Sequence, residues 1–119
     1  MSPARKKTGF VAHELYMWHN TGNYAGPVPY GNPVQPDTHA ENPETKRRFR
    51  NLLEVVGLTP HLQHIAPRMA TEEEILRFHT REHLDRVRTL SAGVGGDAGA
   101  FTPMGRGSYE IAMLSAGGV

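Results

Sequence analysis

Prolines and glycines gather in two stretches of this chain, and these stretches limit where regular structure can form. Residues 21–43 (TGNYAGPVPYGNPVQPDTHAENP) contain five of the nine prolines. Proline has no backbone N–H and a fixed φ, so neither a core helix nor a central strand can run through this stretch. Residues 93–107 (GVGGDAGAFTPMGRG) contain six of the 13 glycines and are predicted to form a surface loop. Regular structure is therefore expected before, between and after these two loops.

The segments outside the loops carry short strand and helix patterns. Residues 8–12 and 62–66 are predicted strands. Asn42 is predicted to cap a helix with Pro43 in its first turn and Gly57 at its end. Apolar residues then recur on one face of that helix, at Phe49, Leu52, Leu53 and Val56.

The second half of the chain shows two further helix starts. Residues 71–74 (TEEE) match a capping box, in which a threonine and a glutamate satisfy each other's backbone N–H groups. Leu84, Val87 and Leu90 form an apolar stripe on another helix, and residues 109–116 are predicted to form a last one. Strand and helix alternating in this order predict an α/β domain with a largely parallel sheet, without a linker that would divide it in two.

Composition excludes several classes of protein. Thirteen Lys and Arg against 12 Asp and Glu leave a net charge of +1, so direct binding of nucleic acid or of a membrane surface is not expected. No apolar run approaches the roughly 20 residues of a membrane-spanning helix, and the basic start, residues 1–7, leads into no secretory signal. The chain has no cysteine, which excludes disulfides and Cys-based metal sites and favours a cytoplasmic location.

Two histidine motifs imitate metal sites. His79, Glu82 and His83 fit the H-x-x-E-H pattern of a zinc hydrolase, but Thr80 between the histidines is a natural helix cap, so a structural role is favoured. Asp37 and His39 form a D-x-H pattern. No apolar strand precedes it, so a solvated turn is favoured over a metal site.

Two charged residues are candidates for binding an anion or a ligand. Arg48 belongs to the basic cluster 46–50 (KRRFR), which is predicted to be a solvated helix face. Because it lies at the boundary of the apolar stripe, it can also turn inward and serve an anionic site. Asp97 is the one acid in the glycine-rich loop, where its carboxylate can stabilise its own turn or accept hydrogen bonds from a ligand.

Taken together, the segments TGFVAHELYMWHNTGN, HAENPETKRRFRNLLEVVGL, ATEEEILRFHTREHLDRV, GGDAG and GRGSYEIAMLSAGG resemble the N-terminal part of zinc-dependent histone deacetylases, in particular the bacterial histone-deacetylase-like amidohydrolases. The resemblance runs from residue 8 to residue 119. It implies a three-layer arginase/deacetylase fold with a mainly parallel sheet. It also implies hydrolysis of N-acetyl amides of lysine or similar amines, with zinc polarising the amide carbonyl.

The resemblance implies roles for four residues. Arg48 stands at the family arginine that lines a channel for acetate, and Asp97 at the rim aspartate that accepts hydrogen bonds from the substrate backbone. Trp18 and Tyr24 lie in the loop at the pocket entrance, where they would contact substrate. Asn42 departs from the family pattern, in which many members have histidine.

The resemblance also predicts what the chain does not contain. The family's zinc ligands and catalytic tyrosine fall after residue 119, so residues 8–119 are interpreted as the N-terminal segment of one deacetylase domain, inactive alone and without bound zinc. Alternatives are a short binding or regulatory module, or a metal hydrolase that uses residues 79–83. Unpaired strand edges and uncovered apolar faces predict poor solubility. The acyl substrate and the oligomeric state stay open.

Overall fold

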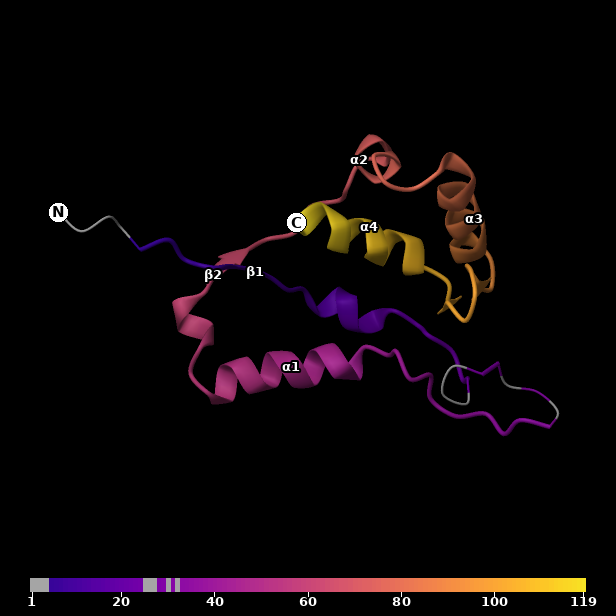
Figure 1. Ribbon diagram of the computed structural model, residues 1–119, viewed down its shortest axis with the longest axis horizontal. Helices are drawn as coiled ribbons and strands as arrows, with labels where there is room; N and C mark the ends of the chain where they lie inside the picture. The colour runs from indigo at the N-terminus through magenta and orange to yellow at the C-terminus, as the bar shows by residue number, and fades with distance from the viewer. Residues whose placement is uncertain (1–4, 25–27, 30, 32) are drawn as a thin grey trace.

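The computed structural model describes residues 5–24, 28–29, 31 and 33–119. Short strands are interspersed among its helices (Figure 1). In chain order they are β1 (Gly9–Val11), η1 (Glu14–Trp18), α1 (Glu44–Val55), η2 (Thr59–His61), β2 (Gln63–Ile65), α2 (Glu72–Leu76), α3 (Arg81–Ala92), β3 (Gly96–Asp97), β4 (Pro103–Met104) and α4 (Ser108–Gly118). Within the expected basic tail, residues 1–4 lie outside the described part, and residues 5–7 are exposed without regular structure.

The two predicted strands pair in parallel, which confirms the expected α/β class. Phe10 of β1 lies opposite His64 of β2, and their rings meet edge to face with centroids 5.8 Å apart. Parallel neighbours need a long crossover. Here the crossover contains η1, the proline-rich loop and α1.

Helix α1 is fixed at both ends by the predicted residues. The Asn42 side-chain oxygen accepts a hydrogen bond from the Glu44 backbone N–H at 3.0 Å, although the helix starts at Glu44, one residue later than predicted. Gly57 adopts φ 74°, and the N–H groups of Gly57 and Leu58 bond back to the Glu54 and Leu53 carbonyls. This pair of bonds is the Schellman ending that a left-handed glycine allows.

The capping box before α2 is confirmed. The Thr71 hydroxyl accepts from the Glu74 backbone N–H, and the Glu74 carboxylate accepts from the Thr71 N–H. Arg68 also donates to Glu74, with a shortest distance of 2.6 Å, and this bond is the main cause that lowers the pKa of Glu74 to about 2. Thr80 caps α3 as predicted, by accepting from the His83 N–H.

Helix α4 is two residues longer at its C-terminus than the prediction, and its N-terminus is capped by another helix. It follows Gly107, which has no side chain to offer, and the Ser91 hydroxyl of α3 instead accepts from the Tyr109 backbone N–H at 2.9 Å. At the other end, a Cβ on Gly117 would collide with the backbone of residues 68–70. Glycine is therefore required for α4 to lie this close to the segment after β2.

The molecule is extended rather than compact. Its radius of gyration is 17.2 Å, against about 13.5 Å for a compact chain of this length. The buried apolar side chains belong mainly to the α3–α4 side, at Ala70, Leu84, Ala98, Met104 and Met113. None of the residues of α1 is buried, and Phe49 and Leu52 of its apolar stripe are 59% and 57% exposed.

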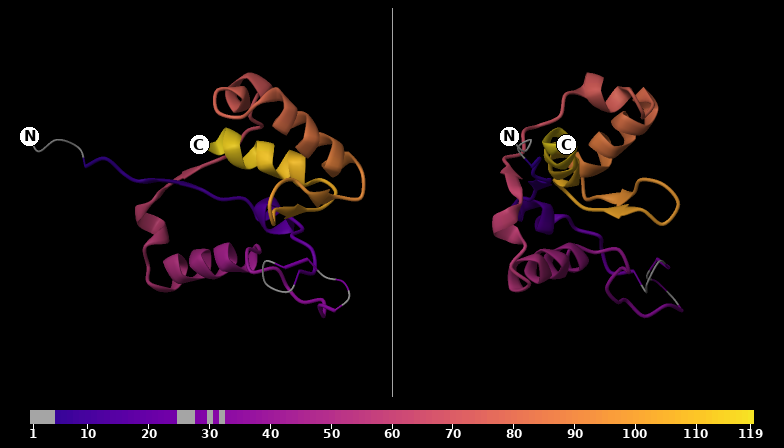
Figure 2. Two further views of the ribbon diagram at one scale, coloured as in Figure 1. Left: turned by 45° about the vertical axis from the view of Figure 1, so that its right-hand side comes forward. Right: turned by 60° about the vertical axis from the view of Figure 1, so that its left-hand side comes forward.

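The other elements lie around β1 and η1. Helix η1 contacts both α1 and α4, and the views show α1 on one side of it and α4 on the other (Figures 1 and 2). Helices α2 and α3 continue beyond α4, away from α1 (Figure 2). In the part of the chain that the structure describes, no helix combines the length and hydropathy needed to cross a membrane.

Candidate functional site

The glycine-rich loop is an ordered hairpin rather than the plain surface loop that was predicted. Gly96 and Asp97 pair in antiparallel fashion with Met104 and Pro103. Gly95 has φ 90°, and a Cβ there would collide with the Met104 carbonyl. Only glycine fits this position, because it combines left-handed backbone with the close approach of β4.

Asp97 organises the tip of this hairpin. Its Oδ1 accepts from the backbone N–H groups of Gly99 at 3.0 Å and Thr102 at 2.9 Å. Burial tends to raise the pKa of Asp97, but these bonds and one from the Tyr24 hydroxyl outweigh it, and the pKa is lowered. The carboxylate is therefore held ionised on an exposed loop, with Oδ1 engaged by its own turn.

The structure brings two predicted rim residues together across 73 positions of sequence. The Tyr24 hydroxyl donates to Asp97 Oδ2 at 3.4 Å. The Tyr24 ring also packs edge to face on His39, with centroids 5.3 Å apart. Asp97, Tyr24 and His39 thus form one contact chain, called here the rim triad, which joins the proline-rich loop to the hairpin.

The prediction of a solvated turn at the D-x-H pattern is right for Asp37 and wrong for His39. Asp37 is exposed and accepts from the Thr38 N–H at 2.7 Å. His39 is only 5% exposed, because Tyr24 covers its ring and its Nδ1 accepts from the Glu41 N–H at 3.0 Å. Its buried Nε2 has no hydrogen-bond partner within the structure as described.

The other two predicted site residues lie apart from the rim triad. Trp18 ends η1 and is 69% exposed. Arg48 lies on the exposed surface of α1. Its neighbour Arg47 is the cation that reaches inward to η1, where it donates to Glu14 at 2.8 Å and lowers the pKa of that carboxyl.

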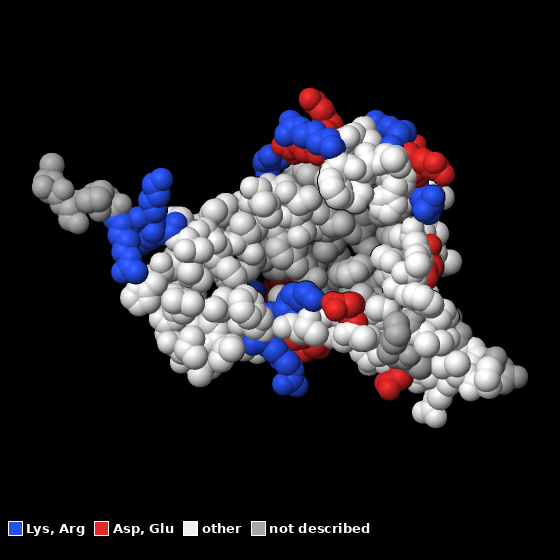
Figure 3. Space-filling model, viewed as in Figure 1, with Lys and Arg blue, Asp and Glu red and all other residues white. Residues whose placement is uncertain are grey.

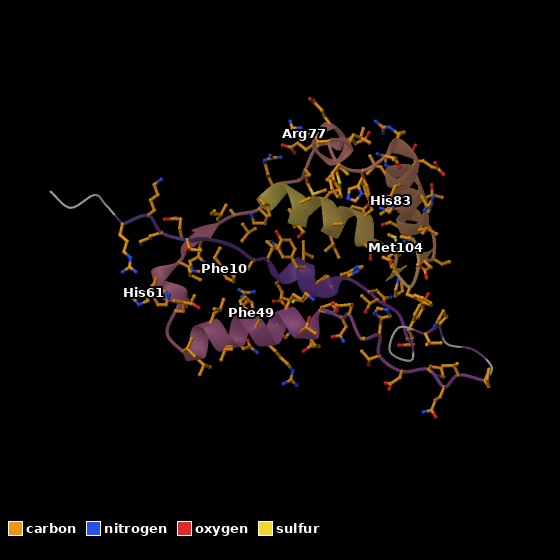
Figure 4. All side chains as sticks on the ribbon, viewed as in Figure 1. Phe10, Phe49, His61, Arg77, His83 and Met104 are labelled. Atoms are coloured by element: carbon orange, nitrogen blue, oxygen red, sulfur yellow. The ribbon has the colours of Figure 1, made fainter. Side chains whose placement is uncertain are left out.

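A hollow of about 560 Å³ lies between α1 and α4, with η1 and β1 along it, and is called here the α1–α4 hollow. Figure 3 shows it open toward the viewer, with charged side chains along its lower edge. Figure 4 shows Phe49 on the side of α1 that faces η1, and Phe10 on β1. Its lining includes Phe10 and Val11 of β1 with Ala12 directly after it, Lys46, Phe49 and Arg50 of α1, and Ser108, Ile111, Ala112 and Ser115 of α4. Sequence reasoning singled out Arg48, whereas Lys46 and Arg50 line the hollow.

A histidine–serine pair lies at the α4 end of the hollow. His19 Nδ1 is 2.8 Å from the hydroxyl of Ser108, which also accepts from the Gly105 N–H at 3.2 Å. Burial lowers the pKa of His19. Nδ1 of a neutral His19 can accept a hydrogen bond from the Ser108 hydroxyl, so the pair ties the end of η1 to the start of α4.

The H-x-x-E-H pattern does not form a metal cluster in the structure. Thr80 caps α3, so His79 lies before this helix and His83 lies within it. Their rings stack with centroids 5.0 Å apart. The Glu82 carboxylate lies 3.5 Å from the Arg86 guanidinium. Over the described residues, no group of three or more His, Asp or Glu side chains could hold a metal ion.

The chain is similar to proteins named as histone deacetylases or as histone deacetylase-like. The sequence model of the histone deacetylase domain matches residues 39–119. A histone deacetylase-like amidohydrolase of Pseudomonas aeruginosa is 47% identical over 115 residues, which are 94% of this chain and 30% of that protein. Histone deacetylase 8 of Arabidopsis thaliana is 33% identical over 85 residues, 68% of this chain and 22% of that protein.

The fold leads to the same group of proteins. The crystal structure of the HDA15 HD domain matches with a TM-score of 0.73 at 25% identity, over 94% of this chain and 30% of that one. The chain thus spans less than a third of the length of these relatives. With its parallel strand pair, its helices and its sequence all matching, the chain belongs to the histone deacetylase family.

Proposed function

We propose that this chain provides the substrate rim of a zinc-dependent deacetylase that hydrolyses N-acetyl amides of lysine or of polyamine-type amines. The observation that carries the proposal is the Tyr24–Asp97 contact. Oδ1 of Asp97 accepts from two backbone N–H groups of its own hairpin, and Oδ2 accepts from the Tyr24 hydroxyl at a long 3.4 Å. An ionised carboxylate oxygen has acceptor capacity left in this arrangement, which suits the backbone or amine N–H of a substrate.

The other predicted site residues take supporting roles in this proposal. Trp18 offers an exposed indole on the loop side of η1, suited to the apolar part of a substrate. Arg48 offers an exposed guanidinium, suited to the acetate product. Both residues lie outside the rim triad, so their loss is expected to affect activity less than loss of Asp97.

The 119 residues alone are proposed to be inactive. Zinc would polarise the acetyl carbonyl in such an enzyme, but the described side chains do not fit a zinc site, since no three possible ligands meet. The chemistry at the metal is therefore not assigned to this chain. Its own contribution is to hold Asp97 ionised and oriented beside Tyr24 at the surface that meets the substrate.

A chimera tests the proposal. This chain replaces the matching 30% of the Pseudomonas amidohydrolase, and deacetylation of an acetyl-lysine peptide and of an acetylated polyamine is measured with zinc. The chimera is expected to be active and the chain alone inactive. Asp97→Ala is expected to raise KM about 10-fold or more, because an ionised acceptor of a substrate N–H is lost.

Matched variants separate the rim from general damage. Asp97→Asn keeps an acceptor and is expected to have a smaller effect, and Tyr24→Phe is expected to raise KM severalfold. Asp37→Ala removes another exposed loop carboxylate and is expected to leave KM unchanged. An unchanged KM in Asp97→Ala, or activity in the isolated chain, would contradict the proposal.

A further inference from the structure

His39 is a buried side chain in an otherwise exposed stretch of loop. It is 5% exposed, whereas its neighbours Thr38 and Ala40 are exposed. Its Nε2 has no hydrogen-bond partner in the part of the chain that the structure describes. Leaving a buried polar atom without a partner costs free energy. Hydrogen bonding at Nε2 therefore does not account for the burial of this ring, and the packing of the ring has to be considered.

The backbone and the ring of His39 are both fixed by the residues that follow it. The Asn42 side-chain amide donates to the His39 carbonyl at 2.9 Å, and Asn42 also caps α1 through the Glu44 N–H. His39 Nδ1 accepts from the Glu41 N–H at 3.0 Å. These bonds hold the imidazole relative to the start of α1 without involving Tyr24. The imidazole is therefore a fixed surface against which another side chain can pack.

Tyr24 contacts His39 with its ring and Asp97 with its hydroxyl. The two rings lie at 68° to each other with centroids 5.3 Å apart, the edge-to-face arrangement that aromatic pairs prefer. The hydroxyl reaches Asp97 Oδ2 at 3.4 Å, which is longer than most O–H···O hydrogen bonds. Because the bond is long, a small displacement of the Tyr24 ring away from His39 is enough to break it.

We infer that His39 is a positioning residue of the substrate rim, whose ring holds Tyr24 so that the Tyr24 hydroxyl reaches Asp97. This inference rests on the proposed function, because His39 affects substrate binding only if Asp97 contacts the substrate. His39 itself acts through Tyr24 and not on the substrate. An aromatic pair of this kind contributes about 2- to 10-fold to an equilibrium, which sets the size of the expected effect.

Two substitutions separate the ring of His39 from its hydrogen bond. His39→Asn removes the ring but keeps an acceptor in the place of Nδ1 for the Glu41 N–H. His39→Phe keeps the ring and removes both nitrogens. In the chimera with the Pseudomonas amidohydrolase, His39→Asn is expected to raise KM about 2- to 10-fold without changing kcat. His39→Phe is expected to restore the KM of the unmodified chimera.

A double variant shows whether His39 acts through Tyr24. Tyr24→Phe lacks the hydroxyl that His39 positions, so adding His39→Asn to it is expected to cause no further rise in KM. General damage to the loop would raise KM in both backgrounds. The matched control is His64→Asn, the same change at an exposed histidine whose ring packs edge to face on Phe10, and it is expected to leave KM unchanged.

A measurement without substrate distinguishes this inference from the proposed function. NMR of the Asp97 carboxyl carbon gives the pKa of this group in the 119-residue chain. Burial tends to raise this pKa, and the hairpin N–H groups and the Tyr24 hydroxyl lower it. His39→Asn and Tyr24→Phe are therefore both expected to raise the pKa of Asp97, whereas His39→Phe and His64→Asn leave it unchanged. Circular dichroism shows whether each variant keeps its helices.

Two results would overturn the inference. One is an unchanged pKa of Asp97 in His39→Asn, and the other is a further rise in KM when His39→Asn is added to Tyr24→Phe. An inactive chimera would instead contradict the proposed function. The pKa of Asp97 in the chain would then still decide whether His39 positions Tyr24.

Discussion

Replacing Ser91 with alanine tests whether α4 depends on a cap supplied by α3. Ser91 is 3% exposed, and its hydroxyl accepts from the Tyr109 N–H at 2.9 Å while donating to the Glu110 carboxylate at 3.2 Å. Gly107, directly before α4, offers no side chain for this purpose. The variant therefore leaves a helix N-terminal N–H without an acceptor in a buried place.

The expected cost can be worked out from these contacts. Replacing a capping serine with alanine costs about 0.5–2 kcal/mol, and the buried position of Ser91 favours the upper end. A local cost of about 1.4–2 kcal/mol corresponds to a 10- to 30-fold larger opening constant. The Tyr109 amide is expected to exchange its hydrogen faster by this factor, while the Leu84 amide in α3, bonded to the Thr80 carbonyl, keeps its rate.

The control is Ser115→Ala, which removes the hydroxyl of an exposed serine in α4. It is expected to change exchange at Tyr109 by less than a factor of about 3, as surface substitutions usually do. Equal exchange rates at Tyr109 in Ser91→Ala and in the unmodified chain would refute the reasoning. In that case the start of α4 would be held by packing and not by the hydroxyl.

Three further outcomes are expected. Burial lowers the pKa of His19, so the folded state resists its protonation. The stability that His19 contributes is therefore full above about pH 6.5 and is lost as the pH drops through the lowered pKa. The urea midpoints at pH 7.5 and pH 5 should differ less in His19→Phe than in the unmodified chain. Gly95→Ala should destabilise the β3–β4 hairpin by about 2 kcal/mol or more, which faster amide exchange at Ala98 would show. Gly57→Ala, whose Cβ meets open space, should lower the free energy of unfolding by about 1 kcal/mol. Leu52→Lys, on the exposed stripe of α1, should reduce concentration-dependent sedimentation while helix content stays the same.

The sequence predicted features that a few neighbouring residues determine. The capping box at Thr71, the Thr80 cap and the ending at Gly57 each depend on side-chain and backbone groups within six positions, and all three are confirmed. The helix before Gly57 starts at Glu44, one residue later than predicted, because its first i→i+4 backbone bond runs from the Arg47 N–H to the Pro43 carbonyl, while Asn42 bonds to the Glu44 N–H.

Features that join distant segments could not be predicted from spacing. Tyr24 and Asp97 were identified separately, and their contact depends on how the proline-rich loop lies against the hairpin. The burial of His39 follows from the same packing, since Tyr24 covers its ring. The cap that Ser91 gives to α4 has no local signal either, because nothing near residue 91 in the sequence indicates which helix end it will meet.

Because α4 approaches residues 68–70 closely at Gly117, the residue at this position indicates where the last helix lies in other members of the family. A larger side chain at this position would have to push α4 away from residues 68–70, whereas Gly57 and Gly107 have no neighbouring atom within 4 Å of an added Cβ. A relative with alanine or serine at the position of Gly117 is therefore expected to hold its last helix farther from the segment after β2. The identity of this single residue can distinguish two spacings of the same fold in an alignment.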